Sequence, residues 1–355
     1  MRMVKPFPYV VLYAVFFSLV SIDANESEIR YAGEMMHLPV GSDVAAMGNS
    51  GVSLATRATS AYWNPAASSM LSEFEVSLEY ANLFWGLAHH GVIALHMPLE
   101  NAGIGLSALL IPFYSGTIQK WDTLSGTFQQ RLHNPDLRAD GSSDGHFYNT
   151  STMMVVSLGR LFSIPLPRSA AGDLPLVMDV GSGVNFKGTW QTTNIDDKVR
   201  VGMNATLDLG VLMRFGVDYD FNYKKLSRFI SLGVSLRNVI PSKMMWSHSD
   251  DGSGKREYKE PVHGTQHFGI SYSDYSGFWG ADWILTVSVI RNYAQTYHFG
   301  VEAEFWNTVS FRVGLSDKVP TLGTGVKFRN YFLDYAFRFD KLEYSPVRIT
   351  MGFNF

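Results

Sequence analysis

Ten histidines and many serines could supply catalytic groups, so their spacing is the first question. The chain has no Gly-x-Ser-x-Gly elbow and no His-Glu-x-x-His zinc motif. His89, His90, His133 and His146 fall at expected strand ends or in a loop, where solvated imidazoles are common. No cysteine is present, which excludes thiolate zinc sites, cysteine nucleophiles and thiol lipid anchors. We therefore expect no enzyme activity, no metal and no cofactor.

Charged side chains alternate with large apolar ones along several segments, and this spacing offers another chemistry. If the apolar faces point outward, these charges point into an enclosed interior. There unpaired charges are costly, so we expect an ion-pair network. A site for a carboxylate or other anion stays open as the alternative, because arginine can engage a carboxylate with two parallel hydrogen bonds. The candidates are Arg214, Glu302, Arg312, Asp334, Arg338 and Arg348.

Period-two alternation identifies the elements that carry these charges. The last nine residues place Val347, Ile349, Met351, Phe353 and Phe355 on one face, which predicts a strand. Similar patterns predict fourteen strands in all. Their expected ranges are 74–82, 89–98, 102–112, 148–161, 175–190, 203–220, 226–238, 264–274, 281–291, 295–306, 308–316, 321–329, 330–339 and 346–355.

Composition indicates where such strands would sit. Aromatic residues make up 14% of the chain, and charged residues make up only 17%. Aromatic side chains also concentrate at the ends of the apolar faces, as expected for girdles at two membrane interfaces. With 29 basic and 32 acidic residues, nothing favours a nucleic-acid partner. We predict an all-β fold: a transmembrane antiparallel barrel of about 14 strands with an N-terminal plug segment.

An even number of strands brings both ends of the barrel to one side, and the longest polar connections then lie on the other side. These connections are 113–147 and 239–263, and we expect both to be extracellular loops. Weak alternation within 117–134 would raise the count to sixteen if it formed two strands. On the lipid-facing strand at 308–316, Val313→Arg should be costly, whereas its inward neighbour Gly314 should tolerate serine at much lower cost.

The N-terminal part divides in two. Residues 1–24 carry Arg2 and Lys5 and a short apolar stretch, as a cleavable signal peptide does, and place the mature chain in the bacterial outer membrane. Residues 25–72 are rich in small residues and precede the barrel at 73–355, so we expect a plug inside the lumen; a periplasmic tail is the alternative. No helix or strand of useful length stands out there. The proposed closing motif is Tyr62, Trp63, Asn64, Pro65 and Ala66.

The stretch Leu38 to Ala55 and the string Tyr62-Trp-Asn-Pro-Ala66 resemble the N-terminal segment of the FadL-like outer-membrane barrels, in particular the PorV/PorQ branch. Leu232–Asn238, Phe311–Leu315 and Leu333–Phe337 agree as well. The resemblance implies fourteen strands and an N-terminal hatch. One departure is Thr56 to Thr59, where the family usually has an acidic pair.

The resemblance also implies two competing functions. The first is movement of hydrophobic small molecules, such as long-chain fatty acids, through a plugged lumen. The alternative is a PorV-type component of a protein secretion system. The expected partners are outer-membrane lipid, the barrel assembly machinery and either a hydrophobic ligand or secretion-system proteins. The segment 239–263 could bind either a ligand or a partner protein.

Overall fold

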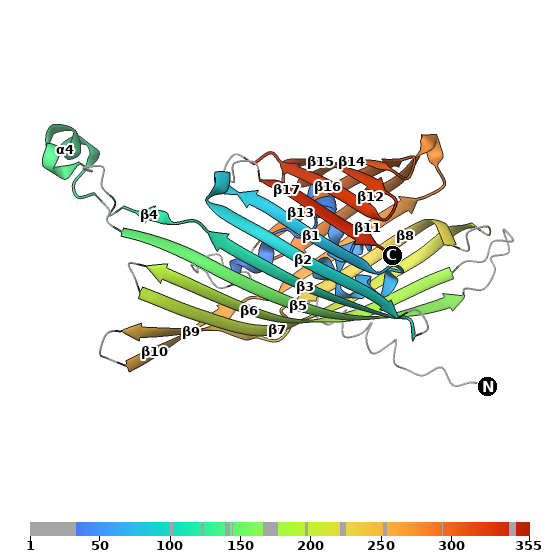
Figure 1. Cartoon of the computed structure of the whole chain (residues 1–355), viewed down its shortest axis with the longest axis horizontal. Helices are drawn as coiled ribbons and strands as arrows, with labels where there is room; N and C mark the ends of the chain where they lie inside the picture. The colour runs from blue at the N-terminus through green and yellow to red at the C-terminus, as the bar shows by residue number, and fades with distance from the viewer. Residues whose placement is uncertain are drawn as a thin grey trace.

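The computed structural model describes residues 33–99, 102–121, 124–138, 143, 145–165, 177–195, 198–220, 225–250, 254–292, 294–340 and 346–355. The predicted signal peptide lies outside them. Within these ranges, 17 strands form one sheet. The first strand, β1 (Glu75–Leu83), pairs antiparallel with the last, β17 (Val347–Asn354), so the sheet closes into a barrel (Figure 1).

Some of these strands share one position in the barrel wall. β4 continues the line of β3 along β5, β9 continues β8 along β7, and β10 leads into β11. The wall is therefore a closed 14-strand antiparallel barrel, which confirms the predicted count and excludes sixteen. The remaining strands are β2 (Ala88–Leu99), β3 (Ile104–Ser115), β4 (Ile118–Lys120), β5 (Gly145–Pro165), β6 (Val177–Ile195), β7 (Lys198–Asp220), β8 (Lys225–Arg237), β9 (Ser242–Asp250), β10 (Gly254–Val262), β11 (Thr265–Asp274), β12 (Ala281–Arg291), β13 (Gln295–Phe305), β14 (Val309–Ser316), β15 (Val319–Phe328) and β16 (Tyr331–Arg338).

The barrel wall is uneven in height. β5, β6 and β7 contain 21, 19 and 23 residues, whereas β14, β16 and β17 contain 8 each. The long strands and the β9–β10 hairpin extend past the others at the end opposite the C-terminus, and α4 (Phe128–His133) lies beyond them (Figure 1). One prediction was wrong here: 239–263 is largely a hairpin rather than a loop. In 113–147 only the short stretches 113–115, 118–120 and 145–147 belong to strands. The sequence of the hairpin tip, residues 247–260, is mostly polar, so it shows no apolar alternation.

The lumen holds residues 33–72 as a plug of short helices: η1 (Glu34–His37), α2 (Ser42–Ala46), η2 (Gly51–Ser53), α3 (Ser60–Trp63) and η3 (Pro65–Met70). None of these helices was predicted, and each has six residues or fewer. Short turns of this kind depend on tertiary contacts for their stability. The other helices are turns outside the lumen: η4 (Phe84–Gly86), η6 (Pro135–Leu137) and η7 (Phe278–Gly280).

Inward-facing glycines make room for the plug backbone. Gly105, Gly159, Gly183 and Gly210 lie side by side on β3, β5, β6 and β7, and we call them the glycine row. A Cβ on Gly183 would lie 2.3 Å from the carbonyl carbon of Pro65. These positions therefore require glycine for close approach rather than for backbone freedom.

The same crowding recurs on the opposite wall. A Cβ on Gly314 would lie 2.3 Å from the backbone nitrogen of Gly48. The expectation that Gly314 would tolerate serine is therefore wrong, because the inward position faces plug backbone rather than open lumen.

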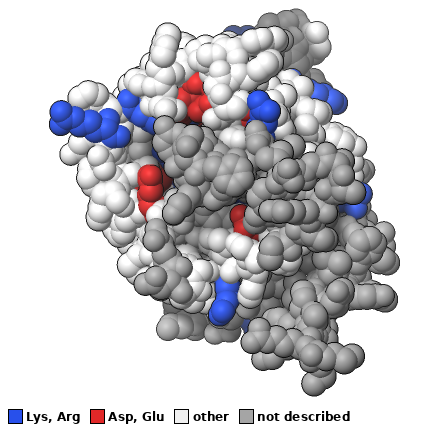
Figure 2. All heavy atoms as spheres, turned by 90° about the vertical axis from the view of Figure 1, so that its right-hand side faces the viewer, with Lys and Arg blue, Asp and Glu red and all other residues white. Residues whose placement is uncertain are grey.

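The described helices contain no segment long and apolar enough to cross a bilayer. On the barrel end that carries the C-terminus, acidic and basic side chains are both visible and lie apart, so the described part of that face shows no patch of one sign (Figure 2).

Candidate functional site

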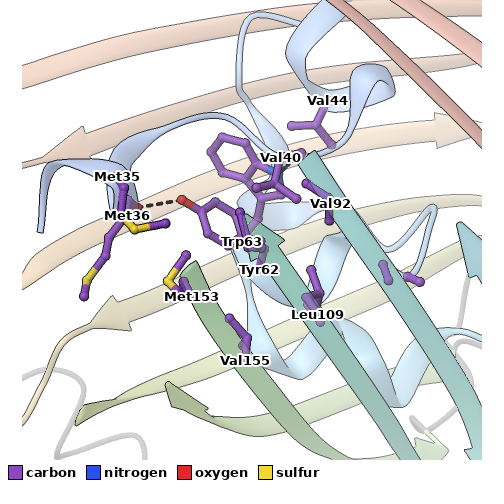
Figure 3. Packing of buried hydrophobic residues seen from close by; sticks show 14 of the residues in the cluster. Met35, Met36, Val40, Val44, Tyr62, Trp63, Val92, Leu109, Met153 and Val155 are labelled. Atoms are coloured by element: carbon purple, nitrogen blue, oxygen red, sulfur yellow. Dashed lines mark hydrogen bonds between the residues drawn. The ribbon is translucent and has the colours of Figure 1, made fainter. Parts of the chain in front are cut away.

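Tyr62 and Trp63 hold the chain that precedes them in place. The Tyr62 hydroxyl donates to the carbonyl oxygen of Met36 at 2.6 Å, and the carbonyl oxygen of Leu38 is 2.9 Å away. The Trp63 indole donates to the carbonyl oxygen of Val40 at 2.7 Å. Both rings are buried, so these two side chains tie residues 36–40 to α3 inside the lumen (Figure 3).

Asn64, Pro65 and Ala66 connect the plug to the barrel wall. The Asn64 amide donates to the carbonyl oxygens of Val52 at 2.9 Å and Val211 at 3.1 Å, and its oxygen accepts from the Ala66 backbone at 3.0 Å. The extended conformation of Asn64 is what a following proline favours, and Pro65 then opens η3. This buried asparagine thus links two parts of the plug to β7.

An apolar cluster lies above the glycine row, toward the end opposite the C-terminus. On the barrel side it contains inward residues of β2, β3 and β5, and on the plug side it contains Met35, Met36, Val40, Tyr62 and Trp63 (Figure 3). Met244 of β9 and Val262 of β10 complete it. The barrel residues are Val92, Ala94, Leu109, Ile111, Met153 and Val155. Part of the lumen wall is therefore apolar, although barrel interiors are usually polar.

Three of the predicted lumen charges meet in one network. Arg312 pairs with both Glu302 and Asp334, and Arg57 of the plug lies 3.5 Å from Asp334. The Arg57 guanidinium also stacks over the ring of Phe332 at 3.7 Å. Arg57 lies in the stretch Thr56 to Thr59, where the family that the sequence resembles usually has an acidic pair. Here a cation joins the plug to the wall. Removing one partner of such a buried pair typically costs about 3–5 kcal/mol.

Arg348 belongs to a separate group. Its guanidinium donates to Glu79 at 2.9 Å, and Glu79 also accepts from Thr350 at 2.9 Å and from the Gly41 backbone at 2.8 Å. Glu79 is thus a second carboxylate that holds the plug. Glu79 was not among the predicted site residues, although its place on an alternating strand was a usable signal.

The other two predicted residues lie elsewhere. Arg214 stacks over Phe229 at 4.3 Å, and Arg338 pairs with Asp340 at 2.9 Å. A further buried pair joins Lys187 to Asp208 at 2.6 Å; Asp208 was expected to face inward, but Lys187 was not. The six candidate charges therefore do not form one site.

A cavity of about 490 Å³ lies between the plug and the strand ends far from the C-terminus. Its lining includes His37 and Leu38 of the plug and Arg237, His267 and His298 of the wall. Burial, together with the nearby cations Arg237 and Lys187, lowers the pKa of His37 to about 3. His37 is therefore neutral at ordinary pH, and protonating it in this position is unfavourable.

The fold and the lumen define the class: a plugged antiparallel barrel of the kind found in bacterial outer membranes. No family model and no curated protein matches the chain. Among solved structures it is similar to the deltaS2 mutant of the TodX monoaromatic hydrocarbon channel, with a TM-score of 0.51 and 11% identity, over 89% of this chain and 98% of that one. A Pseudomonas aeruginosa FadL homologue aligns over 90% of this chain and 98% of that one, at 10% identity and a TM-score of 0.36. The likeness to TodX supports the fold alone.

Proposed function

We propose that this barrel moves hydrophobic small molecules of the long-chain fatty-acid kind across the outer membrane, through a lumen that its plug must partly vacate. The observation that carries the proposal is the apolar cluster. Four methionines, Met35, Met36, Met153 and Met244, are buried in it. Methionine is flexible and polarizable, so such a surface adapts to apolar ligands of varied shape.

The arrangement favours exchange between plug and ligand. The plug covers the apolar wall with two methionines on η1, a single 3₁₀ turn, while the glycine row holds η3 further down the barrel. A ligand could replace the contacts of η1 without unseating η3. The TodX structure is named for a channel of monoaromatic hydrocarbons, which is the same broad chemistry. This proposal assigns the chain no enzymatic role.

The test is saturable uptake of a fluorescent long-chain fatty acid by cells that lack their own carrier. The variant Val92→Thr with Val155→Thr adds hydroxyls to the inner wall while keeping side-chain shape. A matched control, Val76→Thr with Val156→Thr, places the same change on the outer face, where both valines are exposed. Uptake should fall severalfold with the inner pair only. Uptake no higher than in carrier-free cells, or equal loss from both pairs, would overturn the proposal.

One observation favours the second candidate, a PorV-type role in secretion. The segment around α4 projects past the barrel and exposes Trp121, Leu124, Phe128 and Leu132 (Figure 1). Phe128 and Leu132 are one helical turn apart, so they share a face. A protein partner at the cell surface would cover such a face.

Phe128→Ser with Leu132→Ser separates the two roles. The secretion role predicts loss of cargo at the cell surface with fatty-acid uptake intact. Normal secretion in this variant, with the barrel present at normal amount, would exclude a docking role for α4.

A further inference from the structure

A second and larger cavity lies on the outer side of the barrel. Its volume is about 1390 Å³, and it spans β5, β6, β7, β8 and the base of the β9–β10 hairpin. Leu158 and Leu209 line it and are exposed, while their strand neighbours Gly159 and Gly210 face the plug. The leucines therefore point away from the lumen, and the cavity is a groove in the surface that meets the bilayer.

The lining has one sign of charge. Arg160 and Lys243 contribute exposed cations to it, and none of the described residues that line it is Asp or Glu. Arg237 also borders the cavity, but its guanidinium lies in the lumen, where it donates to the carbonyl oxygen of Met36. The rest of the lining is mostly apolar, with Val184, Val211, Val234 and Leu236 among its residues, and it includes a few neutral polar residues such as Ser182 and Ser242. An apolar groove with only cations matches a molecule that combines a hydrocarbon chain with an anionic head.

Arg160 has an unusual position on this surface. It lies on the outer face of β5 between the exposed apolar residues Leu158 and Phe162. Within the described part of the chain, its guanidinium contacts the Phe162 ring at 5.4 Å and forms no ion pair. A lipid-facing arginine costs about 2–4 kcal/mol at the bilayer midplane and much less near an interface. An anion beside Arg160 would remove that cost.

The register places Arg160 near one membrane boundary. It pairs with Ile104, the first residue of β3, which follows the short connection from β2. This end of the barrel is the end that carries the C-terminus. The other cation is Lys243. Met154 pairs with Gly188, and Gly188 pairs with Ala205. Ala205 lies two residues from Met203, the partner of Met245, so Lys243 lies near the level of Met154. Six positions on β5 separate the two levels, about 20 Å along the strand.

We propose that this groove binds one anionic phospholipid of the bilayer, with its phosphate at Arg160 and an acyl chain along Leu158, Leu209 and Leu236. The bilayer supplies this molecule at the correct depth, since Arg160 lies near the boundary. Leu158, Leu209 and Leu236 form one row across β5 to β8, two residues further from that boundary than Arg160. This row crosses three strand spacings, about 14 Å, which accommodates the first part of an extended acyl chain. The site lies outside the lumen and does not depend on the transport proposed above.

The experiment is native mass spectrometry of the full, folded barrel in mild detergent, titrated with phosphatidylglycerol and, separately, with phosphatidylcholine. Arg160→Gln should weaken phosphatidylglycerol binding about tenfold, because it removes a charge-assisted hydrogen bond. Arg329→Gln is the charge-matched control, since Arg329 lies in the turn between β15 and β16. Leu209→Trp should fill the groove and block binding, whereas Leu333→Trp should not; the two leucines are 47% and 49% exposed.

Four results would overturn the proposal. Equal affinity for the two lipids, or equal loss from Arg160→Gln and Arg329→Gln, would mean that the lipids bind without a specific site. Equal effects of the two tryptophan variants would place any site elsewhere. If oleate binds the groove and phosphatidylglycerol does not displace it, the groove takes a free fatty acid instead of a membrane lipid.

Discussion

Gly183→Ala tests whether the glycine row holds the plug. The added Cβ would lie 2.3 Å from the carbonyl carbon of Pro65, whereas ordinary contacts begin at 3.4 Å, so the plug must retreat by about 1 Å. Such overpacking costs about 1–3 kcal/mol. The retreat also stretches the bond from Asn64 to the Val211 carbonyl, now 3.1 Å, which costs about 1 kcal/mol more. Plug docking should therefore weaken by about 2–4 kcal/mol.

The rate of trypsin cleavage measures this loss of plug docking directly, because Arg57 is a cleavage site buried in the plug. Cleavage there requires local opening, so its rate should rise about thirtyfold or more while the barrel keeps its heat-modifiable mobility. The control is Gly188→Ala on the same strand, where the new Cβ meets only the outer end of the Trp190 ring at 3.3 Å. Equal cleavage rates in the two variants would refute the role assigned to the glycine row.

Four further predictions concern the membrane surface and the plug. Val313→Arg should destabilise the barrel by about 2–4 kcal/mol in a urea titration, and no change would mean that this face does not meet lipid. Asn64→Ala removes three hydrogen bonds and should raise trypsin cleavage of the plug without lowering barrel yield; unchanged cleavage would show that the motif does not fasten it. Deleting Phe355 should reduce the folded form in outer-membrane fractions, and normal yield would contradict that. Burial holds the pKa of His37 at about 3, so its contribution to plug docking is fully present above about pH 6.5 and is lost as the pH falls toward 3. His37→Gln should therefore reduce the acid sensitivity of plug cleavage, measured with a protease that is active in acid, such as pepsin. The same sensitivity in both proteins would assign it to other groups.

The membrane-facing half of the fold was predictable from sequence. Barrel strands pair through backbone hydrogen bonds, and their side chains alternate between lipid and lumen. A single segment therefore displays the two-residue period that predicts a strand. Strands such as β13, β16 and β17 were found within a few residues of their bounds. The prediction began β7 too late, although Val199, Val201 and Met203 alternate with polar residues or glycine. It also failed where strands leave the bilayer: the end of β6 and the tip of the β9–β10 hairpin are mostly polar and carry no apolar stripe. There the strand persists because its neighbours supply hydrogen bonds, and no local pattern records that.

The sequence by itself determined that this chain forms a barrel of fourteen strands, that small residues precede it, and that charges face inward. Only the tertiary structure decided which charges meet. Arg312 and Asp334 are 22 residues apart, and Arg57 reaches the same carboxylate from the plug, 277 residues away. The tertiary structure also explains why the wall is rich in glycine, since Gly105 and Gly183 lie directly against the plug backbone. Contacts of this kind depend on how a closed wall presents its inner face to a segment folded inside it, and alternation along one strand carries no information about that partner.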